Sequence, residues 1–362
     1  MVKKLEIIDP LNFPGWDKLL LRNQECSLFY SETWARILAD TYKYKPVYFC
    51  AFNGHKLTVL VPVMEINSEI TGRRGVSLPF TDFCEPIIHD QIQAHDVINT
   101  IIQYGEKSRW ETLLLKGNIR YLQAKTPSRN FYTHMLDLTK DETHIFSRFR
   151  SNTRRNIRKA MREGVQIEIS NSMESFNEFY HLHVKTRKRH GTAIEPFQFH
   201  QNIFKHIISK EKGIVVLALY RKKIIAAAVY FHFGKLSDFQ FGASDMKYQH
   251  LRPSNLVMWE AIKWYSQNGF KSLSLGVTDL ENSGLRHYKN GMATTEKTIG
   301  YYVYNFVKRD FIFHKSLNSP RKRKILRHTP IQMLKFLGEV FYKHTDSYYY
   351  LKHPFNKPLI IK

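Results

Sequence analysis

The sequence is poor in cysteine and in acidic residues, and it has no long apolar run. Its three cysteines, Cys26, Cys50 and Cys84, are odd in number and show no C-x-x-C spacing. This usage fits a reducing compartment and argues against a disulfide framework and against a zinc site, so we expect no metal. No apolar stretch reaches about 20 residues, and the start, MVKKLEIIDP, lacks the apolar core of a signal peptide. We therefore expect a cytoplasmic chain without membrane-spanning helices.

Basic residues are in large excess. The chain of 362 residues holds 55 Lys and Arg against 32 Asp and Glu, which gives a formal net charge of +23. Such a surplus attracts phosphate groups, whether they belong to nucleic acid, nucleotides, phospholipids or pyrophosphate-linked carriers. The hydrophobic share of 43% is ample for the cores of two or three domains.

Part of this charge is concentrated in the stretch SNTRRNIRKAMREG, residues 151–164. The spacing predicts a helix with two faces. Successive residues of a helix are turned by about 100°, and at this rotation the apolar residues fall on one side and the basic residues on the other. The apolar side holds Thr153, Ile157, Ala160 and Met161. The basic side holds Arg154, Arg155, Arg158, Lys159 and Arg162. One face is expected to pack on the protein and the other to meet water or anions.

A strand–turn–strand pattern occurs twice. PVYFCAF and KLTVLVPVMEI flank Asn53-Gly54, a strong signal for a tight hairpin, and GIVVLAL and KIIAAAVYFHF flank a turn near Arg221-Lys222. Each hairpin follows a short helical pattern, SETWARILADTY in one case and FHQNIFKHIISKE in the other. Each is later followed by a helix that leads into an apolar strand, and these two units align without gaps from Ile102 against Ile262 to Leu115 against Leu275.

This repetition predicts an α/β (α+β) fold of two similar lobes, each a mixed sheet flanked by helices. We place the first lobe at residues 1–137 and the second at 138–310. A basic helical tail follows at 311–362.

With both halves laid out, the sequence resembles the FemAB-like branch of the GNAT acyltransferase superfamily, which includes peptidoglycan bridge-forming aminoacyltransferases and acyltransferases of envelope polysaccharide synthesis. The likeness rests on an ordered set of stretches. These are SETWARILADTYKYKPVYF with RRGVSLPFTDF, then SNTRRNIRKAMREGV, then HLHVKTRKRHGTAIEPFQFHQNIF, and finally FGASDMKYQHLRPSNLVMWEAIKWYSQNGF leading to SLGVTDLENSGLRHYKNG. The resemblance implies two GNAT-like lobes with the working cleft mainly in or beside the second.

Acyl transfer to an amine needs a deprotonated nucleophile, a polarised carbonyl and a proton for the leaving group. The resemblance places this chemistry in GVTDLENSGLRHYKNGM, which follows an apolar strand. Tyr288 resembles the tyrosine that protonates the leaving group in ordinary GNAT enzymes. Lys289 resembles the lysine that lies by the acyl ester in the FemAB-like branch. Asp279 is the nearest carboxylate after the strand, and it is either the acceptor of the amine's proton or a helix cap.

The candidate substrate-binding residues are Arg154, Arg158, Tyr180, Arg187 and Asp82. Arginine's planar fork suits phosphate and carboxylate, although a solvated helix end explains Arg187 equally well. The resemblance implies substrate contacts for Asp82 in LPFTDF. For the acyl donor the candidates are Arg252, Ser254 and Asn255, at a helix start suited to phosphate. Ordinary GNAT enzymes have a glycine-rich loop here, whereas this chain reads Arg252-Pro253-Ser254-Asn255. The donor therefore stays open between acyl-CoA and aminoacyl-tRNA, with no tightly bound cofactor.

The resemblance implies an anionic envelope precursor, a sugar nucleotide or a lipid-linked molecule, as the acceptor. In the tail, RKRK precedes a helix whose apolar face includes Ile331, Leu334, Leu337 and Phe341. That arrangement suits either peripheral contact with the inner membrane surface or packing on the second lobe. An alternative for the whole chain is a non-catalytic nucleic-acid-binding protein on a GNAT-like scaffold, although no known nucleic-acid-reading module appears. The sequence leaves the oligomeric state open.

Overall fold

The computed structural model describes residues 5–22, 26–88, 91–119, 122, 125–313 and 320–345. Its fourteen strands form one sheet, in the order β1-β2-β3-β4-β6-β13-β7-β12-β11-β10-β9-β8, with β14 paired to β13 and β5 paired to β3. The strands of the first half are β1 (Glu6–Ile8), β2 (Lys45–Asn53), β3 (Lys56–Ser68), β4 (Gly72–Val76), β5 (Ile87–Ile88), β6 (Thr112–Lys116) and β7 (Arg129–Asp137). Those of the second half are β8 (Gln166–Ser170), β9 (Gly213–Tyr220), β10 (Lys223–Phe233), β11 (Leu236–Ser244), β12 (Ser272–Asp279), β13 (Thr295–Asn305) and β14 (Asp310–Ile312).

Helices cover this sheet. The α-helices are α1 (Trp16–Leu21), α2 (Glu32–Tyr42), α3 (Gln91–Lys107), α4 (Glu142–Ser147), α5 (Ser151–Arg162), α6 (Met173–His190), α7 (Phe197–His206), α8 (Pro253–Gln267), α9 (Ser283–Asn290), α10 (Pro320–His328) and α11 (Ile331–Phe341). The short 3-10 helices are η1 (Leu28–Tyr30), η3 (Ile208–Lys210), η4 (Met246–Leu251) and η5 (Tyr342–His344). Among the helices described, none is long and apolar enough to cross a bilayer.

The two lobes repeat one plan, as predicted. Both predicted hairpins are present, β2 with β3 and β9 with β10. In each lobe the strand that follows the long helix adds in parallel: β6 pairs with β4, and β12 pairs with β11. The equivalent apolar positions of the aligned units, such as Leu115 and Leu275, are both buried.

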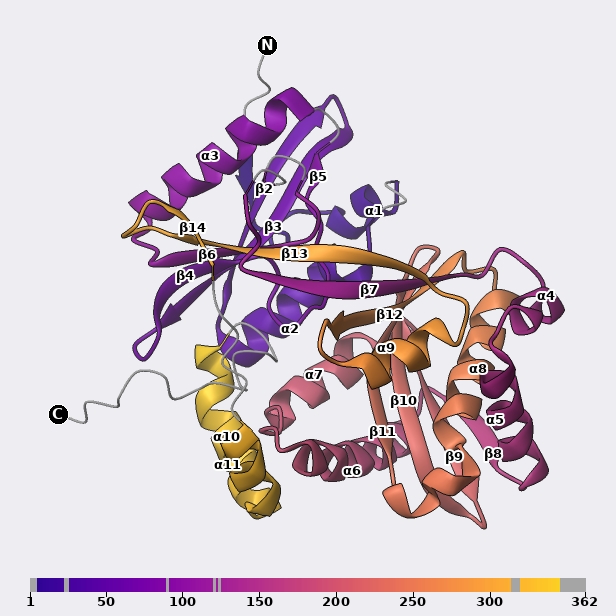
Figure 1. Ribbon diagram of the computed structural model, residues 1–362. Coiled ribbons are helices and arrows are strands. Elements are labelled where there is room, and N and C mark those ends of the chain that lie inside the picture. Colours follow the sequence, from indigo (N-terminus) through magenta and orange to yellow (C-terminus); the bar gives the residue numbers. More distant parts are fainter. Residues whose placement is uncertain are drawn as a thin grey trace.

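Two long strands join the lobes (Figure 1). β7 pairs with β12 of the second half, while β13 pairs with both β7 and β6. The sheet therefore runs without a break from one lobe into the other. This continuity fixes loops of the first half next to β12.

The core has three parts. One apolar cluster lies between the first-half strands and α3, and includes Phe49, Ile98 and Trp110. A second packs the later strands against α5 and α8. The third fills the space where α2, α6 and α7 meet strands of both halves, with Trp34 and Phe199 in edge-to-face contact. Because these aromatic and aliphatic side chains are removed from water, they supply much of the driving force for holding the lobes together.

The basic helix α5 packs largely as its spacing predicts. Thr153, Ile157 and Ala160 are buried against the protein. Met161 was expected on the same face, but it is 45% exposed. It lies near the end of the helix, 100° round from Ala160, and so falls at the edge of the packed stripe.

The described part of the tail packs on the protein. On α11, Leu334 is fully buried, and a side chain at Gly338 would meet the carbonyl oxygen of Ile194 at 1.7 Å. Beyond this helix, the Tyr44 hydroxyl donates to the carbonyl of Tyr342 over 3.1 Å. Of the basic cluster RKRK, the side chains of residues 321–323 lie outside the described residues, as do residues 314–319 and 346–362.

Candidate functional site

The site begins at an irregularity in β12. The register of β12 against β7 shifts between Ser274 and Val277, and Gly276 between them has φ +69°. A side chain at Gly276 would meet Asp82 Oδ2 at 2.3 Å, so this position needs glycine both for its conformation and for the close approach. Asp82 Oδ2 accepts a hydrogen bond from the Val277 N–H over 3.0 Å. A carboxylate of the first lobe is thereby anchored to a strand of the second.

The helix α9 carries Lys289 toward the same strand. The Asn282 side chain caps its start by accepting from the Leu285 N–H. At its end, the Arg150 N–H donates to the Gly291 carbonyl over 2.9 Å, and a side chain at Gly291 would meet Thr153 Oγ1 at 2.5 Å. The inner face of the basic helix α5 therefore fixes where α9 ends.

Lys289 is a buried cation. It is only 4% exposed, and its Nζ donates to the carbonyl of Val277 over 3.0 Å. Burial lowers the pKa of its ammonium group to about 8, while the Asp82 charge acts in the opposite direction. Asp82 and Lys289 thus contact the N–H and the carbonyl of one residue, Val277, and Lys289 is still mainly protonated at neutral pH.

Tyr288 lies beside Lys289 and reaches the start of α8. Its hydroxyl donates to the Ser254 carbonyl over 3.1 Å, and burial raises the pKa of this hydroxyl. α8 begins with Pro253 in its first turn, preceded by Arg252 in the left-handed region at φ +60°. The predicted pair Tyr288 and Lys289 and the predicted donor residue Ser254 therefore come together.

These three residues line a cavity of about 220 Å³. The wall is otherwise built from small and apolar side chains of β10, β11 and α8, with Arg189 and His190 of α6. Arg189 Nη1 donates to the Ser244 carbonyl over 2.6 Å, and burial lowers the pKa of its guanidinium group. The cavity is narrow and mostly apolar, with cationic groups at its edge.

A second cavity, of about 640 Å³, lies between the two halves of the chain. Its lining includes Asp82, Phe83 and Glu85 from the first half, together with Asp238 and Phe239 of β11. Phe239 also lines the smaller cavity, so the two approach each other at β11. β11 and β12 pair only over residues 236–238 and 272–274 in the described chain, which leaves the strands apart beyond this point.

Asp238 has an unusual environment in the larger cavity. Its Oδ2 is buried and has no hydrogen-bond partner among the described residues. Burial raises the pKa of this carboxyl group to about 7, with a further contribution from the Asp82 charge, while a hydrogen bond from Ser274 acts in the opposite direction. A carboxyl group that titrates near neutral pH is suited to accepting a proton.

Other predicted residues lie outside both cavity linings. Asp279 pairs with Arg129 at the end of β12, and Asn282 rather than Asp279 caps α9. Arg154 Nη1 donates to the Ser147 carbonyl over 3.2 Å, and the Arg158 guanidinium lies over the Phe146 ring at 5.5 Å. Both arginines therefore turn back toward α4.

Arg187 and Tyr180 lie where α6 meets the tail. Arg187 donates to the Ala193 carbonyl and, over 2.7 Å, to the Tyr342 hydroxyl. Tyr180 is buried, and Lys335 of α11 lies over its ring at 5.3 Å. Burial raises the pKa of Tyr180 to about 12. Both residues therefore contact the protein's own tail as well as the segment that follows α6.

The residues predicted to bind the acyl donor lie at the start of α8, where the protein itself uses most of the backbone N–H groups. The backbone N–H of Arg252 donates to the Gln249 carbonyl, and that of Asn255 donates to the Arg252 carbonyl. Pro253 has no N–H group. Few backbone donors are thus left to bind a phosphate at this helix start.

Sequence reasoning missed Asp238 and gave Arg189 no role. A single carboxylate within the aromatic run LSDFQFGAS was the available signal for Asp238. Its significance depends on Asp82, which is 156 positions away in the sequence and reaches the same cavity only through the pairing of the strands.

Comparison with known proteins defines the class. Residues 147–290 match the family model described as the Acetyltransferase (GNAT) domain. This range includes α8, α9, Tyr288 and Lys289. The match covers most of the second lobe, and it likens that lobe to an acyltransferase domain of the GNAT type.

Solved structures extend the likeness to both lobes. FemX matches with a TM-score of 0.66 and 12% sequence identity, over 83% of this chain and 97% of FemX. The C-terminal domain of a protein from Agrobacterium fabrum, described as a lysylphosphatidylglycerol synthetase, matches with a TM-score of 0.54 and 12% identity, over 83% and 93%. A tandem GNAT protein from the clavulanic acid biosynthesis pathway gives a TM-score of 0.50 and 7% identity, over 84% and 99%. The chain therefore shares its fold with FemX and with this tandem GNAT protein. The comparison with curated proteins gives no match.

Proposed function

We propose that the protein transfers an acyl or aminoacyl group to an amine of a cell-envelope precursor. The observation that carries this proposal is the meeting of Tyr288 and the buried ammonium of Lys289 in one cavity of a GNAT-type domain. The adjoining acid-lined cavity supplies a place for the amine. Two neighbouring cavities, one for each substrate, are what a transfer reaction requires.

The smaller cavity accepts the acyl group of the donor. There the ammonium of Lys289 stabilises the negative charge that develops on the carbonyl oxygen. The amine nitrogen forms the new bond to the carbonyl carbon, and the bond to the carrier oxygen or sulfur breaks. Tyr288 gives its proton to the departing atom, and its raised pKa keeps that proton in place until then.

The larger cavity accepts the amine. Asp238 takes the proton that the nitrogen loses, because its pKa of about 7 lets it act as a base near neutral pH. Asp82 holds an additional negative charge near the ammonium form of the substrate. The aromatic side chains of Phe29, Tyr30 and Phe83 form apolar walls for the rest of the acceptor.

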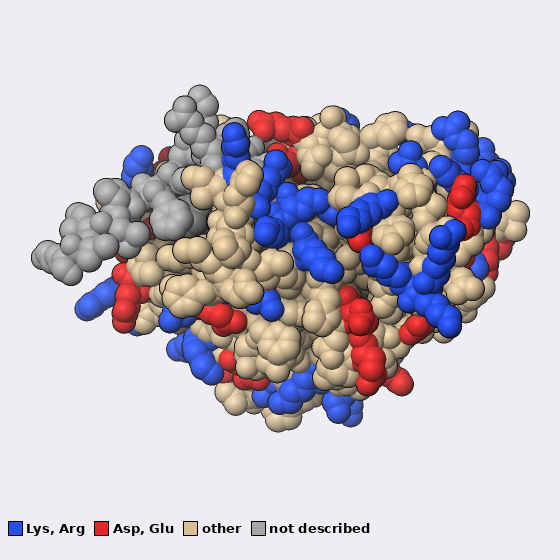
Figure 2. Space-filling model, turned by 90° about the horizontal axis from the view of Figure 1, so that it is seen from below, with Lys and Arg blue, Asp and Glu red and all other residues tan. Residues whose placement is uncertain are grey.

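The start of α8 favours an aminoacyl-tRNA over acyl-CoA as donor. Its backbone N–H groups are largely used within the protein or absent at Pro253, which weakens a pyrophosphate site of the GNAT kind. Figure 2 shows many Lys and Arg side chains on the face seen from below, where α6 and the β9–β10 turn lie in Figure 1. A broad cationic surface suits a large polyanion whose charge is spread over many phosphates.

The inference of an envelope acceptor is based on the family resemblance of the sequence and on the names of the structurally similar proteins. FemX and a described lysylphosphatidylglycerol synthetase share the fold. We infer that the acceptor is a sugar nucleotide or a lipid-linked precursor, and that the protein works in the cytoplasm at the inner face of the membrane. The exposed apolar side chains Met333 and Phe336 of α11 favour such a peripheral contact.

Transfer assays with labelled donors test this function. The chain is incubated with charged tRNA or with acetyl-CoA and a panel of envelope precursors that carry amines. We expect label from tRNA in the product, with a rate that falls steeply as salt rises. Salt-insensitive turnover with acetyl-CoA would reject the tRNA donor while keeping the acyl transfer. No turnover with any donor would reject the enzyme.

The basic face also favours the second candidate, a non-catalytic nucleic-acid-binding protein. Salt-dependent binding of RNA or DNA is common to both functions, so binding alone does not separate them. The Lys289→Ala variant does, because it should abolish transfer while leaving binding of tRNA unchanged. If the variant and the wild type bind equally and neither transfers label, the binding function stands.

A further inference from the structure

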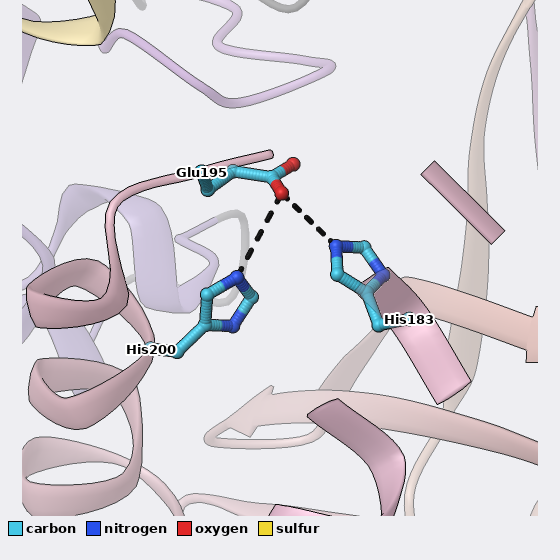
Figure 3. A group of neighbouring side chains, drawn as sticks. All are labelled: His183, Glu195 and His200. Carbon is cyan, nitrogen blue, oxygen red and sulfur yellow. Dashed lines mark hydrogen bonds and ion pairs between the residues drawn. The ribbon is translucent and has the colours of Figure 1, made fainter. Parts of the chain in front are cut away.

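A buried cluster away from both cavities joins α6, the segment before α7, and α7 itself. His183, Glu195 and His200 have side chains that are 5%, 1% and 0% exposed. His183 Nε2 lies 3.0 Å and His200 Nε2 3.7 Å from the same oxygen, Glu195 Oε2. Figure 3 shows one nitrogen of each imidazole ring directed at this oxygen. The three groups therefore converge on one point inside the protein.

The hydrogen bonds of this cluster are incomplete. Within the described part of the chain, neither ring nitrogen of His200 has a hydrogen-bond partner, and His183 Nδ1 has none. A neutral imidazole carries one N–H donor and one acceptor, and leaving them unpaired in the interior costs about 1–3 kcal/mol per group. Aromatic rings close the surroundings, with Phe241 at 5.3 Å from His183 and 5.7 Å from His200. A bound water molecule or metal ion would satisfy these nitrogens.

We propose that His183, Glu195 and His200 bind a structural zinc ion. Ligand atoms around a tetrahedral zinc ion, with bonds of about 2.0–2.1 Å, lie about 3.3–3.4 Å apart. The separations of 3.0 and 3.7 Å bracket this value, and all three ligand atoms lie within 4.8 Å of one another. Two imidazoles and one carboxylate form a donor set that zinc favours, and a water molecule completes the tetrahedron.

The protonation states agree with ligation. Burial lowers the pKa of His200, which keeps its imidazole neutral with a lone pair available. Burial by itself opposes ionisation of Glu195, but the Arg187 guanidinium is the largest of the influences that outweigh it and hold the pKa of the carboxyl group well below its usual range. Metal ligands need these deprotonated forms.

The positive charge of Arg187 repels a cation bound at this cluster. Its Nη2 lies 3.4 Å from Glu195 Oε1, the oxygen that does not face the histidines. The arginine is also held by the Tyr342 hydroxyl, so it acts as an outer partner that orients the carboxylate. The zinc ion would connect α6 and α7 and, through Arg187, the docked tail. This proposal departs from the expectation of no metal, which was based on the cysteines alone, and the spacing of His183, Glu195 and His200 gave no sequence signal.

Metal analysis tests the proposal with the full chain, purified without a histidine tag after growth in zinc-supplemented medium. We expect about one zinc per chain by mass spectrometry, lost on His200→Ala. His206→Ala is the matched control: His206 lies on the same helix, 3.8 Å from Asp40 and outside the cluster. That variant should keep its zinc. Circular dichroism verifies that each protein is folded.

Cobalt substitution gives a second measurement that depends on no variant. The wild-type chain is stripped of metal, refolded and titrated with Co²⁺. Binding at a tetrahedral site should give intense visible d–d bands that saturate near one equivalent, and zinc should abolish them. A folded wild-type chain that retains no zinc and gives no such bands overturns the proposal, and the three residues are then a hydrogen-bonded group alone.

Discussion

The burial of Lys289 predicts that removing its charge makes the protein more stable while it destroys activity. The change is Lys289→Met, which keeps most of the side-chain volume. The pKa of Lys289 falls from 10.5 to about 8, chiefly through burial. At about 1.4 kcal/mol per pKa unit, this lowering means that the charged ammonium reduces the free energy of unfolding by about 3 kcal/mol.

The sign depends on pH. Below pH 8 the lysine is charged in both the folded and the unfolded chain, so the full cost is present. Between about pH 8 and 10.5 the folded chain has lost the proton and the unfolded chain has not, and the cost disappears as pH rises. Methionine cannot donate a hydrogen bond to the Val277 carbonyl, and this loss reduces the gain in stability by about 1–2 kcal/mol. The variant should therefore gain about 1–2 kcal/mol at pH 7. At pH 10 it should lose up to about 1 kcal/mol, because the unfolded lysine is still mainly charged there and about 1 kcal/mol of the cost remains.

Urea denaturation at both pH values measures this reversal. Lys116→Met is the matched control, because Lys116 is fully buried outside both cavities and donates to the carbonyls of Leu78 and Thr81 over 2.9 and 2.8 Å. Its loss removes a charged donor from both carbonyls, of which that of Leu78 keeps the Thr81 hydroxyl, so this variant should be less stable than the wild type at pH 7. The reasoning fails if Lys289→Met is also less stable at pH 7, or if its difference from the wild type is the same at both pH values.

Three further outcomes follow from the same geometry. In a pH–rate profile, the transfer rate should rise through about pH 7 as Asp238 loses its proton and fall above about pH 8 as Lys289 loses its proton. The Asp238→Asn variant should lack the rise at acidic pH and turn over about 100-fold more slowly or worse. In thermal unfolding, Gly276→Ala should destabilise the chain by about 2 kcal/mol or more, because the added methyl group displaces Asp82. Gly54→Ala is the control: Gly54 has a similar φ, but an added methyl group would meet no atom within 4 Å, so this variant should lose only about 1 kcal/mol. Tyr288→Phe should lower kcat by about 10- to 100-fold with KM and melting temperature nearly unchanged, and equal kcat values would remove the hydroxyl from the mechanism.

Local patterns in the sequence were sufficient for the hairpins and for the repeated helix–strand units. The Asn53-Gly54 signal and the enrichment in β-branched and aromatic residues predicted the first hairpin, and the structure has it as β2 and β3, with Gly54 and His55 in the turn. The aligned helix–strand units predicted the repeated lobes, and β6 and β12 do occupy matching parallel positions. These features depend on residues a few positions apart, which the chain's own periodicity records.

The resemblance also indicated Lys289, Tyr288 and Ser254, and the structure brings these three to one cavity. It did not indicate that Lys289 would be buried. The contacts that the tertiary structure alone decided are those between distant segments: Asp82 against Val277, Asp238 beside Asp82, and Glu195 between two histidines. Their physical reason is the sheet that runs through both lobes, because strand pairing sets which loops meet, and no local pattern encodes that pairing.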